Sequence, residues 1–162
     1  MNNIELFIGM TILGIMIIST YFYYIGKSST ELVDKLWVGI DKKYRPLYTI
    51  MMIFATIGFL AFAYYTSTNE VENYMLVVTA VLLILIPAIF WMGPTYYSIK
   101  NNKYDFVVPM VLILTALGAI SLSSLLYINK VDVITQVLFL LFTLHVTILD
   151  GTIWNLKYVN SF

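Results

Sequence analysis

Long apolar stretches, separated by short clusters of charged residues, make up the pattern of this chain. An α-helix needs about 20 apolar residues to cross the hydrocarbon core of a bilayer. Five stretches meet that length, at residues 4–26, 47–66, 74–98, 104–128 and 131–154. The pattern predicts an all-α, polytopic membrane protein, in which five transmembrane helices form a single bundle over residues 1–162.

Basic residues lie almost entirely in the connections on one side of these spans. Lys130 is the exception, and the other eight are Lys27, Lys35, Lys42, Lys43, Arg45, Lys100, Lys103 and Lys157. The positive-inside rule then predicts an external N-terminus and a cytoplasmic C-terminus. A four-span arrangement would lose this charge asymmetry, so five spans fit the sequence better. We expect a multi-pass integral protein of the plasma membrane or of an organelle membrane.

The first connection carries an amphipathic pattern of its own. Ser28 and Glu31 have the spacing of a capping box, and apolar residues then recur at helical spacing up to Ile40. This predicts a short interfacial helix over residues 29–40, which ends at Gly39. Such a helix serves either as a connector on the membrane surface or as a lid over the cytoplasmic mouth of the bundle.

Polar residues of the last span follow one face of an α-helix. At about 100° per residue, five of them fall within roughly a 60° arc: Gln136, Thr143, Thr147, Asp150 and Trp154. A carboxylate in hydrocarbon is costly, so Asp150 should face protein or a water-filled cavity rather than lipid. It either bonds to polar groups of neighbouring helices or forms the floor of a binding cavity.

The single histidine lies in the same span but on the opposite face. In an α-helix His145 and Asp150 could not pair with one another, so we expect His145 to bond to a neighbouring helix. Partners for the Asp150 carboxylate are expected from elsewhere in the chain, first among Arg45, Lys100 and Tyr48.

Small residues mark where helices can approach closely. Ala116, Ala119 and Ser123 form such a stripe on the fourth span, and Gly58 with Ala61 form another on the second.

Composition excludes several classes of function. The chain is 60% hydrophobic and 11% charged, with a formal net charge of zero and no basic cluster typical of nucleic-acid binding. The lack of cysteine excludes disulfides and thiol catalysis, and one histidine does not make a transition-metal site. We identify no catalytic residues and no metal ligands, and an enzyme is the less favoured class.

Three local motifs add to the layout of five spans and a long first loop. Leu149–Leu156 has the form Leu-Asp-Gly-Thr-Ile-Trp-Asn-Leu, Trp91–Pro94 has the form Trp-Met-Gly-Pro, and Leu36–Ile40 contains Trp37 ahead of Arg45-Pro46. The chain thereby resembles the TspO family of tryptophan-rich sensory proteins and mitochondrial translocator proteins. Asp150 and Trp154 match the family's closing Leu-Asn-x-x-x-Trp pattern, with an acid in place of the amide. The chain departs from the family in having three tryptophans and single rather than paired prolines.

The resemblance implies a pocket that opens to the cytoplasmic side, is covered by the first loop and takes flat hydrophobic ligands such as porphyrins or sterols. It also implies a possible homodimer formed through helix faces, for which Ala116–Ser123 is the candidate. On this basis we expect a small receptor or carrier without a cofactor, apart from a possible bound porphyrin or sterol/lipid. Its partners are the lipid bilayer and a hydrophobic small molecule, with no nucleic acid. The expected ligand-binding residues are Trp37, Tyr48, Trp91, Thr143, Thr147, Asp150 and Trp154.

Two alternatives remain open. One is a structural or assembly subunit of a membrane complex, without a ligand of its own. The other, less favoured, is a sterol- or lipid-isomerase type of enzyme, which requires two ionisable groups that face one another in a dry cavity.

Overall fold

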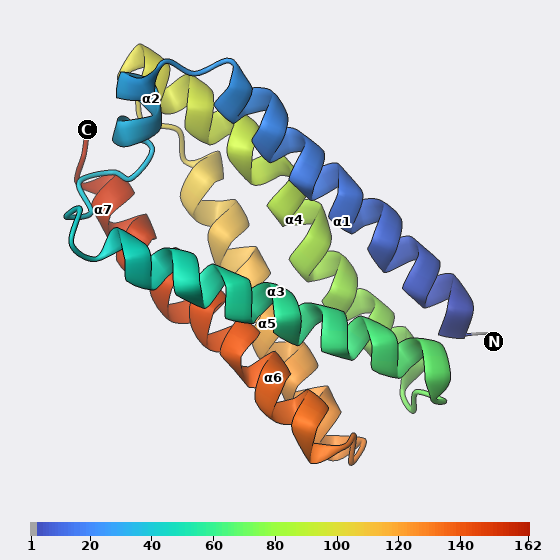
Figure 1. The fold of residues 1–162 in the computed structure, drawn as a ribbon. Coiled ribbons are helices and arrows are strands. Elements are labelled where there is room, and N and C mark those ends of the chain that lie inside the picture. Colours follow the sequence, from blue (N-terminus) through green and yellow to red (C-terminus); the bar gives the residue numbers. More distant parts are fainter. Residues whose placement is uncertain (1–2) are drawn as a thin grey trace.

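The computed structural model describes residues 3–162 and is built from helices (Figure 1). Five helices are long and apolar enough to cross a membrane, which confirms the predicted all-α bundle. Four are continuous α-helices: α1 (Asn3–Gly26), α3 (Arg45–Thr68), α4 (Tyr74–Asn101) and α5 (Val107–Ile128). The last span, called the fifth helix here, consists of α6 (Val133–Leu144), the π-helix η1 (His145–Trp154) and α7 (Asn155–Val159).

The helix of the first connection is shorter than the amphipathic pattern predicted. It covers only α2 (Thr30–Lys35), and its N-cap is Ser29, whose side chain accepts a hydrogen bond from the Leu32 amide. The expected cap residue Ser28 bonds instead to the carbonyl of Tyr24. Val38 and Gly39 have left-handed backbone angles, φ 43° and 77°, so the chain turns where an α-helix to residue 40 would have continued.

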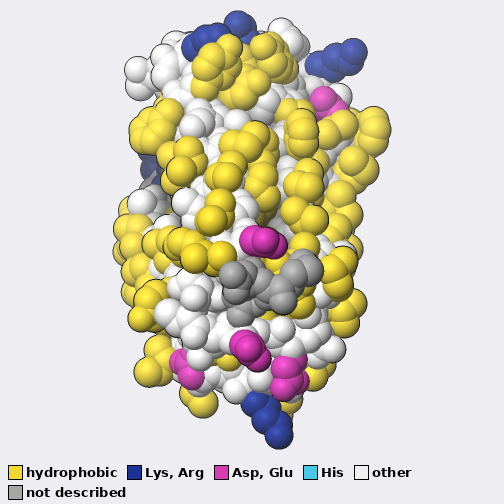
Figure 2. All heavy atoms as spheres, turned by 90° about the vertical axis from the view of Figure 1, so that its right-hand side faces the viewer, with side chains coloured by type: hydrophobic (Ala, Val, Ile, Leu, Met, Phe, Trp, Pro, Cys, Tyr) yellow, Lys and Arg dark blue, Asp and Glu magenta, His cyan; other side chains and the backbone are white. Residues whose placement is uncertain are grey.

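Charged side chains divide the bundle into two ends. At the end called basic here lie α2, the connection after α4 and the C-terminus; at the acidic end lie Glu70, Glu72 and Asp132 (Figure 1). Figure 2 shows one flank covered by hydrophobic side chains, with charged side chains mainly at its two ends: mostly Lys and Arg at the upper end, and mostly Asp and Glu, with one basic side chain, at the lower end. This distribution suits a bilayer around the bundle. Which side of the membrane each end of the bundle faces stays a prediction.

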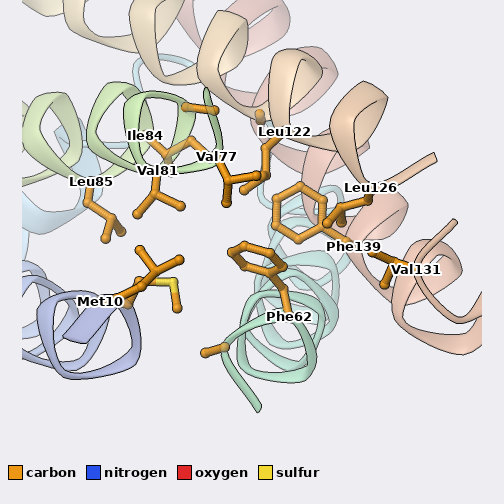
Figure 3. Close-up of a cluster of buried hydrophobic side chains, with 14 of the residues drawn as sticks. Met10, Phe62, Val77, Val81, Ile84, Leu85, Leu122, Leu126, Val131 and Phe139 are labelled. Carbon is orange, nitrogen blue, oxygen red and sulfur yellow. The ribbon is translucent and has the colours of Figure 1, made fainter. Parts of the chain in front are cut away.

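Helix packing is closest toward the acidic end. α4 packs against α5 and α3 packs against α6, while α1 contacts both α4 and α3. Phe62 and Phe139 are fully buried, with ring centroids 5.4 Å apart, in an apolar cluster with residues of α1, α4 and α5 (Figure 3). One turn away, a Cβ on Gly58 would lie only 2.1 Å from the Leu138 carbonyl oxygen, so the backbones of α3 and α6 touch there.

The small-residue stripe of α5 also packs inside the bundle. Ala119 is fully buried, the Ser123 hydroxyl hydrogen-bonds the Thr143 hydroxyl at 2.7 Å, and Ala116 packs beside Gly151. The expectation that this stripe serves as a dimer face is therefore wrong, because the fifth helix of the same chain occupies it. The possible homodimer itself stays a prediction.

Candidate functional site

A π-helix in the middle of the fifth helix sets the geometry of the site. The Asn155 amide bonds to the Asp150 carbonyl, five residues earlier, and the Thr152 hydroxyl bonds to the Thr147 carbonyl at 2.8 Å. In this hydrogen-bond pattern, residues five apart lie above one another, as residues four apart do in an α-helix. π-Helical turns are rare, and they occur frequently at functional sites.

This change of period brings His145 and Asp150 together. The imidazole Nε2 lies 3.3 Å from the Asp150 carboxylate oxygen Oδ2, and the His145 side chain is only 6% exposed. The expectation that the two residues could not pair is wrong, because it assumed an α-helix at these positions. The expected partners Arg45 and Lys100 are engaged elsewhere, the first with Asp34 and the second with the Tyr96 hydroxyl.

The Asp150 carboxylate lies among side chains of other helices. The Tyr48 hydroxyl of α3 donates to the carbonyl of the preceding residue, Leu149, at 3.4 Å, and Tyr21 of α1 contacts Trp91. The Asp150 side chain is nevertheless one third exposed. The carboxylate is therefore only partly enclosed, and its expected position facing protein rather than lipid stays a prediction.

Aromatic rings line the same region, and we call Tyr21, Trp37, Tyr48, Trp91 and Trp154 the aromatic cluster. The ring centroids of Trp91 and Trp154 are 5.4 Å apart, those of Tyr21 and Trp91 are 5.5 Å apart, and those of Trp37 and Tyr48 are 6.1 Å apart. Offset and edge-to-face contacts of this kind stabilise a rigid apolar wall. Four helices and the first loop contribute to it.

The first loop closes the basic end over this cluster. The Trp154 indole N–H donates to the Leu36 carbonyl at 3.2 Å, and the side chains of Val38 and Ile40 are buried in the bundle. Outside the membrane span, Arg45 pairs with Asp34 and keeps the pKa of that carboxyl below its usual value. The loop is therefore attached to the fifth helix, and it is in the position expected of a lid.

Five of the seven expected site residues come together in this region: Trp37, Tyr48, Trp91, Asp150 and Trp154. Thr143 and Thr147 do not join them. Thr143 bonds to Ser123 on α5, and the Thr147 hydroxyl bonds to the Thr143 carbonyl at 2.6 Å. The π-helix rotates the residues after His145 relative to those before it, so the predicted polar stripe is divided.

Two residues of the site were not among those expected. Tyr21 has the same place near a span end as many membrane tyrosines, so its sequence context indicated only an interfacial anchor. His145 was assigned to the wrong face. The signal for His145 in the sequence is that Asp150 follows it by five positions, which is the spacing of a π-turn.

Buried polar atoms without partners gather around the site. In the part of the chain that the structure describes, the side-chain atoms of this kind are Trp91 Nε1, His145 Nδ1 and Asn155 Oδ1. Unpaired buried groups are unfavourable, so these three atoms are the least satisfied side-chain positions in the described part of the chain.

Two hollows open elsewhere on the bundle. One of about 260 Å³ lies between α1 and α4 and is lined by residues that include Tyr24, Phe90 and Pro94. The other, of about 290 Å³, lies between α3 and α6 at the acidic end, beside Asp132 and Tyr65. Among residues 3–162, no three metal-ligating side chains lie close enough together to hold an ion.

Comparison of the chain with protein-family models, with curated proteins and with solved structures finds no match. The geometry of the site is therefore the basis for a functional assignment. It combines a carboxylate, a buried imidazole and two phenol hydroxyls with a wall of indole rings, beneath a loop attached to the fifth helix.

Proposed function

We propose that this protein is a small integral-membrane receptor or carrier, which binds a flat hydrophobic ligand of the porphyrin or sterol kind. The ligand lies beside α1, α3 and the π-helix, under the first loop. The partly exposed carboxylate of Asp150 among the rings of the aromatic cluster is the observation that carries the proposal. Binding sites for small hydrophobic molecules have this form, an apolar aromatic wall with a few convergent polar groups.

Two further features support this assignment. The buried Trp91 Nε1 has no hydrogen-bond partner, so a ligand oxygen or nitrogen would satisfy it. The resemblance to the TspO family puts a ligand under the first loop, where Trp154 now bonds to Leu36. With an external N-terminus, the site would open to the cytoplasmic side.

Intrinsic fluorescence tests the proposal directly, because the only three tryptophans of the chain are Trp37, Trp91 and Trp154. The purified protein in detergent is titrated with protoporphyrin IX and, separately, with dehydroergosterol, a sterol that accepts energy from tryptophan. We expect saturable quenching with at least one of the two. Asp150→Ala should weaken that binding about tenfold, since the ligand loses a charged hydrogen-bonding partner.

Glu70→Gln is the matched control, because it also removes one negative charge but lies at the acidic end. It should bind as the wild type does. N-Acetyltryptophanamide in the same detergent corrects for absorption by the porphyrin. If neither ligand quenches saturably in protein whose circular dichroism and unfolding transition are intact, the proposal is wrong.

The contact between His145 and Asp150 favours a second candidate, an enzyme of the sterol-isomerase type. An imidazole bonded to a carboxylate is a common arrangement for moving a proton. His145 itself is buried, so Asp150 would be the group that meets the substrate. Incubation of the protein with a Δ8 sterol, followed by separation of the double-bond isomers, distinguishes the two functions, since a receptor returns the sterol unchanged.

A further inference from the structure

The charge of the site indicates what kind of head group its ligand carries. The inference rests on the proposed function, because it concerns the polar end of the same flat hydrophobic ligand. Asp150 is the acidic side chain of the site, and it is one third exposed. The groups that face it are His145 on its own helix, Tyr21 on α1 and Tyr48 on α3.

His145 does not neutralise the carboxylate. Its Nδ1 is buried without a partner, so a protonated imidazole would bury a second N–H donor that has no acceptor. The geometry favours the neutral form, in which the Nε2 hydrogen is donated to Asp150 Oδ2, at 3.3 Å. With two neutral phenols beside it, the site as a whole is negative when Asp150 is ionised.

The nearby basic side chains already have partners, and the Arg45 guanidinium lies 5.3 Å from the ring centroid of Trp37 at the edge of the cluster. Arg45 is hydrogen-bonded to Asp34 and to the Ile40 carbonyl, and Lys27 is bonded to the Tyr23 hydroxyl. Lys100 lies over the ring of Tyr96, 5.5 Å from its centroid. An anionic head group beside Asp150 would therefore meet a carboxylate, while the charge of Arg45 is already paired with Asp34.

The rings beside Asp150 suit a cation as well. The faces of tryptophan and tyrosine attract ammonium groups within about 6 Å, more strongly where water is excluded. Tyr21 and Trp91 contact one another beside the carboxylate, with ring centroids 5.5 Å apart. A protonated amine there would pair with Asp150 and lie against these rings.

We propose that the ligand of this site is a flat hydrophobic amine, whose protonated nitrogen pairs with the Asp150 carboxylate between α1 and α3. Neutral analogues of the same shape bind more weakly, and carboxylated ones bind most weakly. The selectivity arises in Asp150 rather than in the apolar wall. Asp150→Asn therefore removes it and leaves the shape of the site unchanged.

Two ring systems, each with three head groups, test this in the purified protein. The sterols are 3-aminocholestene, cholesterol and cholesteryl hemisuccinate; the porphyrins are protoporphyrin IX, its dimethyl ester and its diamide with ethylenediamine. Affinities come from tryptophan quenching for the porphyrins and from displacement of dehydroergosterol for the sterols. Within the ring system that binds, we expect the amine to bind about tenfold or more tightly than the neutral form.

Asp150→Asn should bring the amine and the neutral form within about twofold of one another, while Glu70→Gln should keep the wild-type preference. If the neutral or the carboxylated form binds as tightly as the amine in the wild type, the inference is wrong and the receptor function stands. The same holds if the amine preference persists in Asp150→Asn. If no member of either ring system binds to folded protein, both the inference and the proposed function are wrong.

Discussion

Toward the acidic end, α3 and the fifth helix meet backbone to backbone at Gly58 and then through the buried rings of Phe62 and Phe139. Toward the basic end, the same two helices meet through Tyr48, whose hydroxyl donates to the Leu149 carbonyl of the π-helix, next to the partly exposed carboxylate of Asp150. The three unpaired buried polar atoms found in residues 3–162 belong to α4 and to the fifth helix from His145 onward. One half is closely packed, and the other retains buried polar groups without hydrogen-bond partners.

Under the proposed function, stability and ligand binding would be carried by different parts of the same helix. Within the fifth helix, α6 makes the close apolar contacts, and η1 carries the site residues Asp150 and Trp154. Substitutions at the α6 contacts should therefore change the free energy of unfolding. Substitutions in η1 should change the attachment of the first loop or the affinity for a ligand.

The largest effect is expected from Gly58→Ala. The added Cβ would lie 2.1 Å from the Leu138 oxygen, which is backbone and can move only if α3 and α6 separate. We expect a loss of about 3 kcal/mol in the free energy of unfolding, measured by denaturation in mixed detergent micelles.

Gly14→Ala is the control for that experiment, because nothing lies within 4 Å of the added Cβ. It should leave stability unchanged or raise it by about 0.5 kcal/mol through helix propensity. Equal stabilities of the two variants would contradict the close contact between α3 and α6.

A smaller and more local effect is expected from Trp154→Phe at the basic end. The variant keeps a ring in the aromatic cluster but loses the hydrogen bond to the Leu36 carbonyl, a contribution of about 1 kcal/mol. Hydrogen exchange at the Val38 and Ile40 amides should become about fivefold faster. Exchange at α3 amides near Phe62 should not change, and a uniform increase along the chain would contradict a local role.

The smallest effect is expected at the exposed N-cap of α6. The amide and hydroxyl of Thr135 hold the pKa of Asp132 below its usual value. A lowered carboxyl pKa stabilises the folded state above the pKa of the unfolded chain, and this stabilisation is lost as the pH falls through the folded value. Asp132→Ala should cost about 0.5 kcal/mol at pH 7.

The pH dependence provides the check on that prediction. Between pH 6 and pH 3, the wild type should lose more stability than Asp132→Ala, and the two unfolding curves should converge. Ligand binding should be the same in both at pH 7, since the cap lies at the opposite end from the site. A difference in stability that stays constant with pH would contradict the role of the carboxylate.

Hydropathy predicted the fold because length and apolar composition determine which segments cross a bilayer. The ends of α2 depended on local backbone angles at Val38 and Gly39, which a capping pattern does not specify. The site was predicted in part. Asp150, Trp154, Thr143 and Thr147 were all predicted from one α-helical face, and Trp91 from a motif of the family that the chain resembles; the two threonines were misplaced because the fifth helix abandons that period. A choice between α- and π-helical hydrogen bonds depends on packing against α3 and α5, and single-sequence periodicity contains none of that packing.

The π-helix also has a consequence for how this chain can change by insertion and deletion. Asp150 follows His145 by five positions, whereas in an α-helix two side chains on the same face are four positions apart. Removal of one residue between them would let the fifth helix become regular and still keep imidazole and carboxylate side by side. A related chain that is shorter by one position here could therefore keep the same pair, and an alignment that treats the gap as a loss would miss it.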